Sequence, residues 1–213
     1  LHSTSRRQRQ MCIRDSSIYL RYSPEVESFG IDESWIELTG SPLLQQKTPL
    51  EIANEIRTTV KEEVGLTVSI GVSFNKIFAK LGSDMKKPDA VTVITRESFK
   101  DQIWPLPVSD LLYVGRATTE KLRLYGIRTI GDLAQADRAM LIRRLGVNGE
   151  KLWVFANGLD QSRVMPCDYE IPIKSVGHGI TCTDDLFSKD EVRHVLTVSY
   201  THLRAHETRH DLV

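Results

Sequence analysis

The sequence predicts an α+β fold in which a sheet covered by helices is followed by a small module made only of helices. Two patterns predict it. Between residues 17 and 104, short runs of β-branched and aromatic residues alternate with two segments of helical periodicity. Between residues 105 and 165, short helical runs follow one another, most of them closed by a glycine. The length of 213 residues and the 40% apolar content are typical of a globular protein.

The two ends of the chain are set aside because they are related through their coding DNA. The codons for Met11–Ser16, read on the opposite strand, encode the Val-Ser-Tyr-Thr-His sequence of residues 198–202. Both ends resemble translated transposon-type sequencing adapters, so residues 1–16 and 198–213 are excluded from the fold prediction. One pattern typical of a metal-binding helix face is excluded with them, the three histidines His202, His206 and His210.

The first apolar run, residues 26–38, ends at a Thr-Gly-Ser-Pro turn, so we expect a strand or one arm of a hairpin. A helix is expected over residues 49–64. Thr48 and Glu51 have the spacing of a capping box, and Gly65 follows the last apolar position.

Next we expect a strand over residues 66–72, a helix over residues 74–85 with Ser73 as its N-cap, and a strand over residues 91–94. The order strand, helix, strand, helix, strand is typical of a sheet covered by helices. In the all-helical part we expect five short helices, over residues 106–112, 118–125, 129–135, 138–145 and 149–157.

The adjacent carboxylates of Asp32 and Glu33 are the first candidate catalytic residues. Phosphoryl transfer assisted by two metal ions needs hard oxygen ligands, and carboxylates supply them. In a regular strand neighbouring side chains point to opposite faces, so both can serve one site only where the backbone is distorted. Gly30 permits such a distortion. The alternative is an acidic pair at the solvated end of a strand.

Three lysines form a second candidate group. Lys76 and Lys80 are one helical turn apart, and Lys87 lies in the Lys-Pro-Asp turn after the helix, where its ammonium group can meet a phosphate chain. Asp84 is a candidate to orient Lys87 or to reach a metal ion through water. Each of these residues has a simpler interpretation as part of a solvated, charged helix surface.

A candidate nucleic-acid contact lies at the turn before the second expected helix of the helical module. In a helix-hairpin-helix element, backbone N–H groups at such a turn hold a DNA phosphate without reading bases. Tyr113 stands where these hairpins usually have their first glycine. The alternative is a plain helical turn. The residues assigned to the contact are Val114, Gly115, Arg116, Ala117, Thr118 and Lys121, with Arg123 adding positive charge.

Charge and cysteine content set wider limits. The net charge is zero, but residues 105–165 carry 9 basic and 6 acidic side chains, which weakly favours a nucleic-acid partner. No transmembrane run or secretory signal is visible, so we expect no membrane partner and a cytoplasmic location. Outside the excluded ends, Cys167 and Cys182 are too few for a disulfide framework, which favours a reducing compartment.

The motifs occur in an order that resembles a Y-family, lesion-bypass DNA polymerase of the UmuC/DinB type, and the resemblance covers residues 18–196. Gly30 departs from the serine usual in that family. The resemblance rests on Gly-Ile-Asp-Glu at residues 30–33, Ser-Ile-Gly-Val-Ser at 69–73 leading into Asn-Lys-Ile-Phe-Ala-Lys at 75–80, Lys-Pro at 87–88, Gly-Ile-Arg-Thr-Ile-Gly-Asp-Leu at 126–133, and Lys-Ser-Val-Gly at 174–177.

The resemblance implies a domain order. Residues 17–104 would form part of a polymerase palm sheet with covering helices, and residues 105–165 a helix-hairpin-helix thumb. A proline-bounded linker over residues 166–173 would lead to the start of a little-finger domain over residues 174–197, which opens with a strand-like run to Thr183.

The resemblance also implies roles for individual residues. Asp32 would be a metal ligand, Glu33 would complete the catalytic metal site, and Lys87 would contact the incoming triphosphate. With two Mg²⁺ ions, the primer 3′-hydroxyl would attack the α-phosphate of a dNTP on primer-template DNA. A sliding clamp would be a further partner, bound through a C-terminal region that these residues do not include.

The family's first palm strand, with its D-x-D-x-F-F metal aspartate, and its fingers would precede residue 17, so we expect the chain as written to lack catalytic activity. Two other functions remain open. A nucleotidyl cyclase with a Gly-Gly-Asp-Glu-Phe motif also places Asp-Glu on a palm-like sheet, but it gives no account of the helical module. A non-catalytic DNA-binding fragment would use the thumb alone to hold phosphates.

Overall fold

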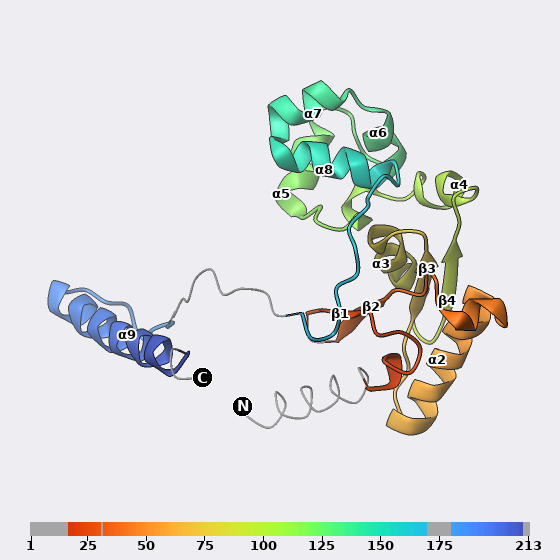
Figure 1. Ribbon diagram of the computed structural model, residues 1–213. Coiled ribbons are helices and arrows are strands. Elements are labelled where there is room, and N and C mark those ends of the chain that lie inside the picture. Colours follow the sequence, from red (N-terminus) through yellow and green to blue (C-terminus); the bar gives the residue numbers. More distant parts are fainter. Residues whose placement is uncertain (1–16, 31, 170–179, 211–213) are drawn as a thin grey trace. The chain divides into compact units, whose positions relative to one another are not determined.

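The computed structural model describes residues 17–30, 32–169 and 180–210, and the chain divides into two units between Asp168 and Tyr169 (Figure 1). The first unit contains two small sheets, the helices that cover them and the module of short helices. The second unit contains helix α9 (Lys189–His210). The predicted α+β class, with the all-helical part after the sheets, is confirmed in the first unit.

The first sheet is an antiparallel hairpin of β1 (Val26–Phe29) and β2 (Glu33–Ile36), so residues 26–38 hold both arms of a hairpin rather than the single strand or arm expected there. Gly30 follows β1 with a φ of 71°. This is the left-handed region of the backbone, which residues other than glycine rarely adopt. The chain therefore turns sharply before it reaches Asp32.

The second sheet pairs β3 (Ile70–Ser73) with β4 (Val91–Ile94) in parallel. The bounds of β4 are those predicted. Strand β3 begins later than the strand expected over residues 66–72, because the four residues of β4 pair only with residues 70–73. The four strands do not form the single sheet that their order suggests. Within the described part of the chain, each of the four strands has one edge without a strand partner.

Helix α3 (Lys76–Met85) connects β3 to β4 and packs on both strands. Glycine at position 71 is what allows the close approach. A Cβ built on Gly71 would lie 1.8 Å from the carbonyl oxygen of Ala79, a separation that real atoms do not adopt. Gly82 faces the same contact from the helix side, with Gly71 Cα 3.3 Å from its own built Cβ.

The predicted N-cap of α3 is wrong. Asn75 caps the helix, and its side-chain oxygen accepts a hydrogen bond from the Phe78 N–H at 2.8 Å. Ser73 is the last residue of β3, and its hydroxyl donates to the carbonyl oxygen of Ile94 at 3.0 Å. Both residue types cap helices well, so the choice depends on where β3 stops pairing with β4.

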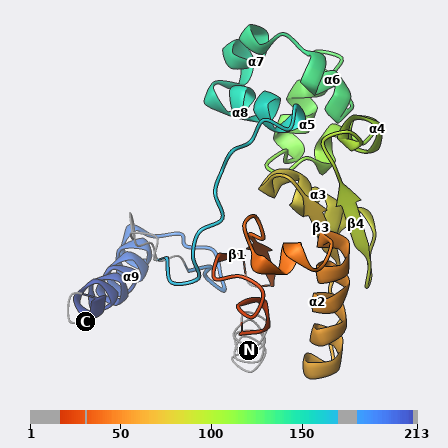
Figure 2. The same ribbon diagram turned by 45° about the vertical axis from the view of Figure 1, so that its right-hand side comes forward.

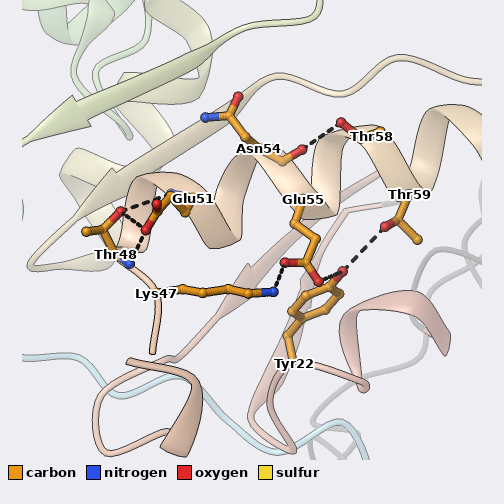
Figure 3. A network of polar contacts seen from close by, with 8 residues as sticks. All are labelled: Tyr22, Lys47, Thr48, Glu51, Asn54, Glu55, Thr58 and Thr59. Atoms are coloured by element: carbon orange, nitrogen blue, oxygen red, sulfur yellow. Dashed lines mark hydrogen bonds and ion pairs between the residues drawn. The ribbon is translucent and has the colours of Figure 1, made fainter. Parts of the chain in front are cut away.

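Helix α2 (Pro49–Val64) has the predicted bounds, and Figure 3 shows how it begins. Thr48 and Glu51 form the expected capping box: the Glu51 N–H donates to the Thr48 hydroxyl, and the Glu51 carboxylate accepts from the Thr48 N–H at 2.7 Å. Farther along, Glu55 accepts a hydrogen bond from the Tyr22 hydroxyl, which ties the segment before β1 to the helix.

The helical module contains four of the five expected helices, with ends shifted by two residues at most. They are α5 (Arg116–Arg123), α6 (Ile130–Gln135), α7 (Arg138–Leu145) and α8 (Val147–Ala156). The helix expected over residues 106–112 is only a 3₁₀ turn, Val108–Asp110. Helix α4 (Phe99–Ile103) and the 3₁₀ turn Pro42–Gln45 were not predicted, because neither is long enough to show a helical period.

One apolar core runs through α3, β4, α4 and the helical module. Its buried members include Phe78 of α3, Ile94 of β4, Ile103 of α4 and Leu133 of α6. The module is therefore packed on α3 and β4 rather than joined to them by a connector alone.

The expected linker and strand-like run, residues 166–183, fall largely outside the described residues. Residues 180–183 of that run form no strand. Helix α9 continues past residue 198, where the sequence analysis set the end of the chain aside. No helix in the described part of the chain is long and apolar enough to cross a membrane.

Candidate active site

Asp32 and Glu33 lie at the tip of the β1–β2 hairpin. Asp32 is exposed in the turn, whereas Glu33 is the first residue of β2 and is partly buried. The distortion expected at Gly30 is present. The two carboxylates are therefore not held on opposite faces of one regular strand.

The two lysines of α3 contact this hairpin. Lys80 Nζ lies 3.0 Å from Glu33 Oε1, and its side chain is only 15% exposed. One helical turn earlier, Lys76 Nζ lies 2.6 Å from Glu27 Oε1 and 4.3 Å from the centroid of the Trp35 ring. The interpretation of these lysines as a solvated basic surface is therefore wrong.

Asp84 joins Lys80 to Lys87. Its Oδ2 lies 2.5 Å from Lys80 Nζ, and its Oδ1 lies 2.8 Å from Lys87 Nζ, so the orienting contact considered for Lys87 is present. Burial alone would raise the pKa of Asp84, but hydrogen bonds from the two lysines lower it below its ordinary value. Burial alone would lower the pKa of Lys80, but Asp84 and Glu33 raise it. Glu33, Lys80, Asp84 and Lys87 thus form a row of alternating charge.

The turn that carries Lys87 is fastened to α2. Asp89 adopts a φ of 54°. Arg57 Nη1 donates to its carbonyl oxygen at 3.0 Å and to its Oδ1 at 2.8 Å, and Lys61 Nζ donates to its Oδ2 at 2.9 Å. The hydrogen bond from Lys61, followed by that from Arg57, lowers the pKa of Asp89. The sequence analysis missed Arg57 and Lys61, because only the fold brings α2 beside this turn.

A cleft of about 750 Å³ opens beside the hairpin. Residues of β2 and β3 line it, and Asp32, Glu33, Lys80 and Lys87 are among its charged residues. The carboxylates and the lysines that the sequence singled out separately therefore share one cavity.

The carboxylates of this cleft fit a divalent metal ion by donor type. In the described residues, no three His, Cys, Asp or Glu side chains are grouped as a metal site. Mg²⁺ is nevertheless commonly bound by one or two carboxylates together with substrate phosphates and water. Asp32 and Glu33 match that pattern, and Lys80 forms an ion pair with Glu33.

The turn before α5 places the predicted DNA contact at a helix N-terminus. Tyr113, in the place of the usual glycine, itself adopts a φ of 70°, and its ring lies 6.1 Å from that of Phe155. Gly115 is the N-cap of α5, no side chain caps it, and the space beside it is open. An anion can therefore approach the first-turn N–H groups, beside the exposed Arg116.

The other residues predicted to contact DNA differ in exposure. Ala117 and Lys121 are exposed on α5, and Thr118 is partly buried. Val114 is 6% exposed and belongs to the apolar core, so only its backbone is available to a ligand.

Comparison with known proteins relates the chain to a group of polymerases. The family model for impB/mucB/samB proteins matches residues 3–84. A DNA polymerase IV of Acetivibrio thermocellus is 54% identical over 181 residues, which are 85% of this chain and 45% of that protein. DNA polymerase IV 1 of Bacillus subtilis is 40% identical over 176 residues, 83% of this chain and 42% of that protein. The chain thus spans less than half the length of these relatives.

Solved structures show the same fold at lower identity. DinB from Sulfolobus solfataricus has a TM-score of 0.67 and 22% identity, covering 75% of this chain and 47% of that one. An insertion ternary complex of Dbh DNA polymerase gives a TM-score of 0.68 with the same identity and coverage. The family match and the polymerase IV relatives support a Y-family, DinB-type polymerase, and the solved structures show that the fold is shared.

Proposed function

We propose that this chain is the later palm and the thumb of an error-prone, lesion-bypass DNA polymerase. Its parent protein would add nucleotides from dNTPs to a primer 3′-hydroxyl on primer-template DNA. The observation that carries the proposal is the cleft in which Asp32 and Glu33 lie with Lys80 and Lys87. This set supplies oxygen ligands for a divalent ion and positive charge for a triphosphate.

The charged residues of the cleft and Asp84 are assigned roles in this proposal. Asp32 and Glu33 bind metal, and Lys80 orients the Glu33 carboxylate. Lys87, whose side chain is 56% exposed, contacts the triphosphate, while Asp84 holds its ammonium group toward the cleft. Two bound Mg²⁺ ions would stabilise charge on the attacking and leaving oxygens.

The thumb would hold the DNA backbone. The N–H groups at the start of α5 receive a phosphate, and Arg116 and Lys121 add positive charge beside it. Contacts of this kind position the duplex without reading its sequence, which suits an enzyme that extends any primer.

A chimera tests the catalytic proposal. Residues 17–197 replace the matching stretch of the 54%-identical DNA polymerase IV, and primer extension is measured with Mg²⁺ and four dNTPs. We expect extension by the chimera and a loss of about 10²–10³-fold in rate in Asp32→Asn, because a lost metal ligand removes several kcal/mol of charge stabilisation. The control Asp101→Asn, at an exposed carboxylate of α4, should retain the rate. A folded chimera that fails to extend, or an Asp32→Asn variant that extends normally, would contradict the proposal. Extension by the 213-residue chain alone would contradict the separate expectation that this chain lacks activity.

A non-catalytic DNA-binding role is the second candidate, favoured by the open N-terminus of α5. Gel-shift titrations of the 213-residue chain at two salt concentrations should show binding that weakens with a log–log slope of roughly 0.9 per neutralised phosphate. Lys121→Gln should lower the magnitude of this slope by about 0.9, the amount expected for the loss of one phosphate contact. Arg138→Gln, at an α7 side chain that pairs with Glu150 of α8, is the control. The absence of a retarded band at both salt concentrations would reject this role.

Cytoplasmic location and clamp binding complete the proposal. The free thiols of Cys167 and Cys182 suit a reducing compartment. A sliding clamp would bind outside residues 17–197. A nucleotidyl cyclase would use a similar carboxylate pair, but it has no use for the helical module.

A further inference from the structure

We infer that Glu27 and Lys76 form a docking site for the backbone of residues 163–165, the segment that leaves the helical module. Glu27 Oε2 accepts a hydrogen bond from the Met165 N–H at 2.8 Å. Lys76 Nζ donates to the carbonyl oxygen of Arg163 at 3.3 Å and to the Glu27 carboxylate at 2.6 and 2.7 Å. An ion pair thus holds one amide and one carbonyl group that are two residues apart.

The docking site is largely buried and is held from several sides. The side chain of Lys76 is 12% exposed and that of Glu27 is 24% exposed. Trp35 lies opposite Glu27 in the β1–β2 ladder, its ring lies beneath Lys76 Nζ, and its Nε1 donates to the Lys76 carbonyl oxygen at 3.0 Å. Val164, the residue between the two held backbone groups, is 8% exposed. The site therefore fits an extended backbone with an apolar side chain at its centre.

This contact decides where the following chain departs. Helix α8 ends at Ala156, but the segment after it returns to β1, as Figures 1 and 2 show. Residues beyond Met165 therefore start from the hairpin that carries Asp32 and Glu33, and not from the helical module. Loss of the contact would move the departure point back to the end of α8. This inference does not depend on catalysis or on DNA binding.

Limited proteolysis of the 213-residue chain tests the docking site. Trypsin cuts after Arg163 only when its carbonyl group is released, so the wild-type chain should resist. Glu27→Ala and Lys76→Met should each raise the initial rate of this cut about tenfold, as expected for the loss of a hydrogen bond to a charged group. The control Glu25→Ala removes an exposed carboxylate just before β1 and should leave the rate unchanged.

Two readouts separate local release from general unfolding. Cleavage after Arg143, an exposed residue of α7, should change less than twofold in the variants. Val164→Ser alters only the docked segment, and it should accelerate the cut after Arg163 and hydrogen exchange at the Met165 amide. Rapid cleavage of the wild-type chain after Arg163, at the rate of the variants, would overturn the inference. Equal acceleration after Arg143 and Arg163 in Val164→Ser would also overturn it.

Discussion

Gly71→Ala is expected to lower the free energy of unfolding of the first unit by roughly 3 kcal/mol or more, at or beyond the upper end of the range for overpacked cores. The new Cβ would lie 1.8 Å from the Ala79 carbonyl oxygen and 2.6 Å from the Ser83 amide nitrogen. Both are backbone atoms of α3, so no side-chain rotation relieves the clash. The helix has to move away from β3. Urea unfolding followed by circular dichroism measures the loss.

Gly115→Ala is the matched control for this substitution. No atom lies within 4 Å of a Cβ built there, and its φ of −82° suits alanine. We expect a loss of at most about 1 kcal/mol, because alanine is a poorer N-cap than glycine but meets no clash. Wild-type stability in Gly71→Ala would mean that α3 does not pack against β3 as closely as described.

Phe78→Ala is expected to cost about 3–5 kcal/mol, the usual range for a buried phenylalanine. Phe78 is fully buried, with its ring 5.4 Å from Phe99 and 5.6 Å from Phe74. Its core also includes Ile94 of β4 and residues of the helical module, so the β3–β4 sheet and the module should lose structure together. Coincident midpoints by circular dichroism and by tryptophan fluorescence would confirm one transition, since Trp35 lies in β2 and Trp153 in α8.

Phe187→Ala provides the comparison for Phe78→Ala, because Phe187 is 90% exposed in the second unit. It should change the stability of the first unit by less than about 0.5 kcal/mol. Two separate transitions in Phe78→Ala, one for the β3–β4 sheet and one for the module, would contradict a shared core.

The parts of the fold that local signals specify could be predicted from the sequence. The bounds of α2 follow from Thr48, Glu51 and Gly65, which lie next to the helix ends they determine. The N-cap of α3 could not be predicted in the same way. Ser73 and Asn75 are both good caps, and the pairing of β3 with β4 decides between them.

In the candidate site, too, contacts between residues close in sequence could be predicted, whereas contacts between distant residues could not. Asp84 and Lys87 are three residues apart, so their contact could be anticipated from helical spacing. The bond between Arg57 and Asp89 joins residues 32 positions apart, and that between Glu27 and Met165 joins residues 138 apart. No pattern along the chain indicates such pairs, because they exist only once the elements have packed together.

The contacts of the two lysines of α3 also set the position of the β1–β2 hairpin along the helix. Lys76 and Lys80 are four residues apart on a helix, a rise of about 6 Å. Their counterparts on β2, Trp35 and Glu33, are two residues apart on a strand, a rise of about 6.8 Å. The distance between the two lysines along the helix therefore nearly equals the distance between Trp35 and Glu33 along the strand. Both contacts can form together at only one alignment of the hairpin and the helix. A slip of one residue would turn the whole strand over. The spacing of two lysines thus fixes how far the tip bearing Asp32 extends along α3.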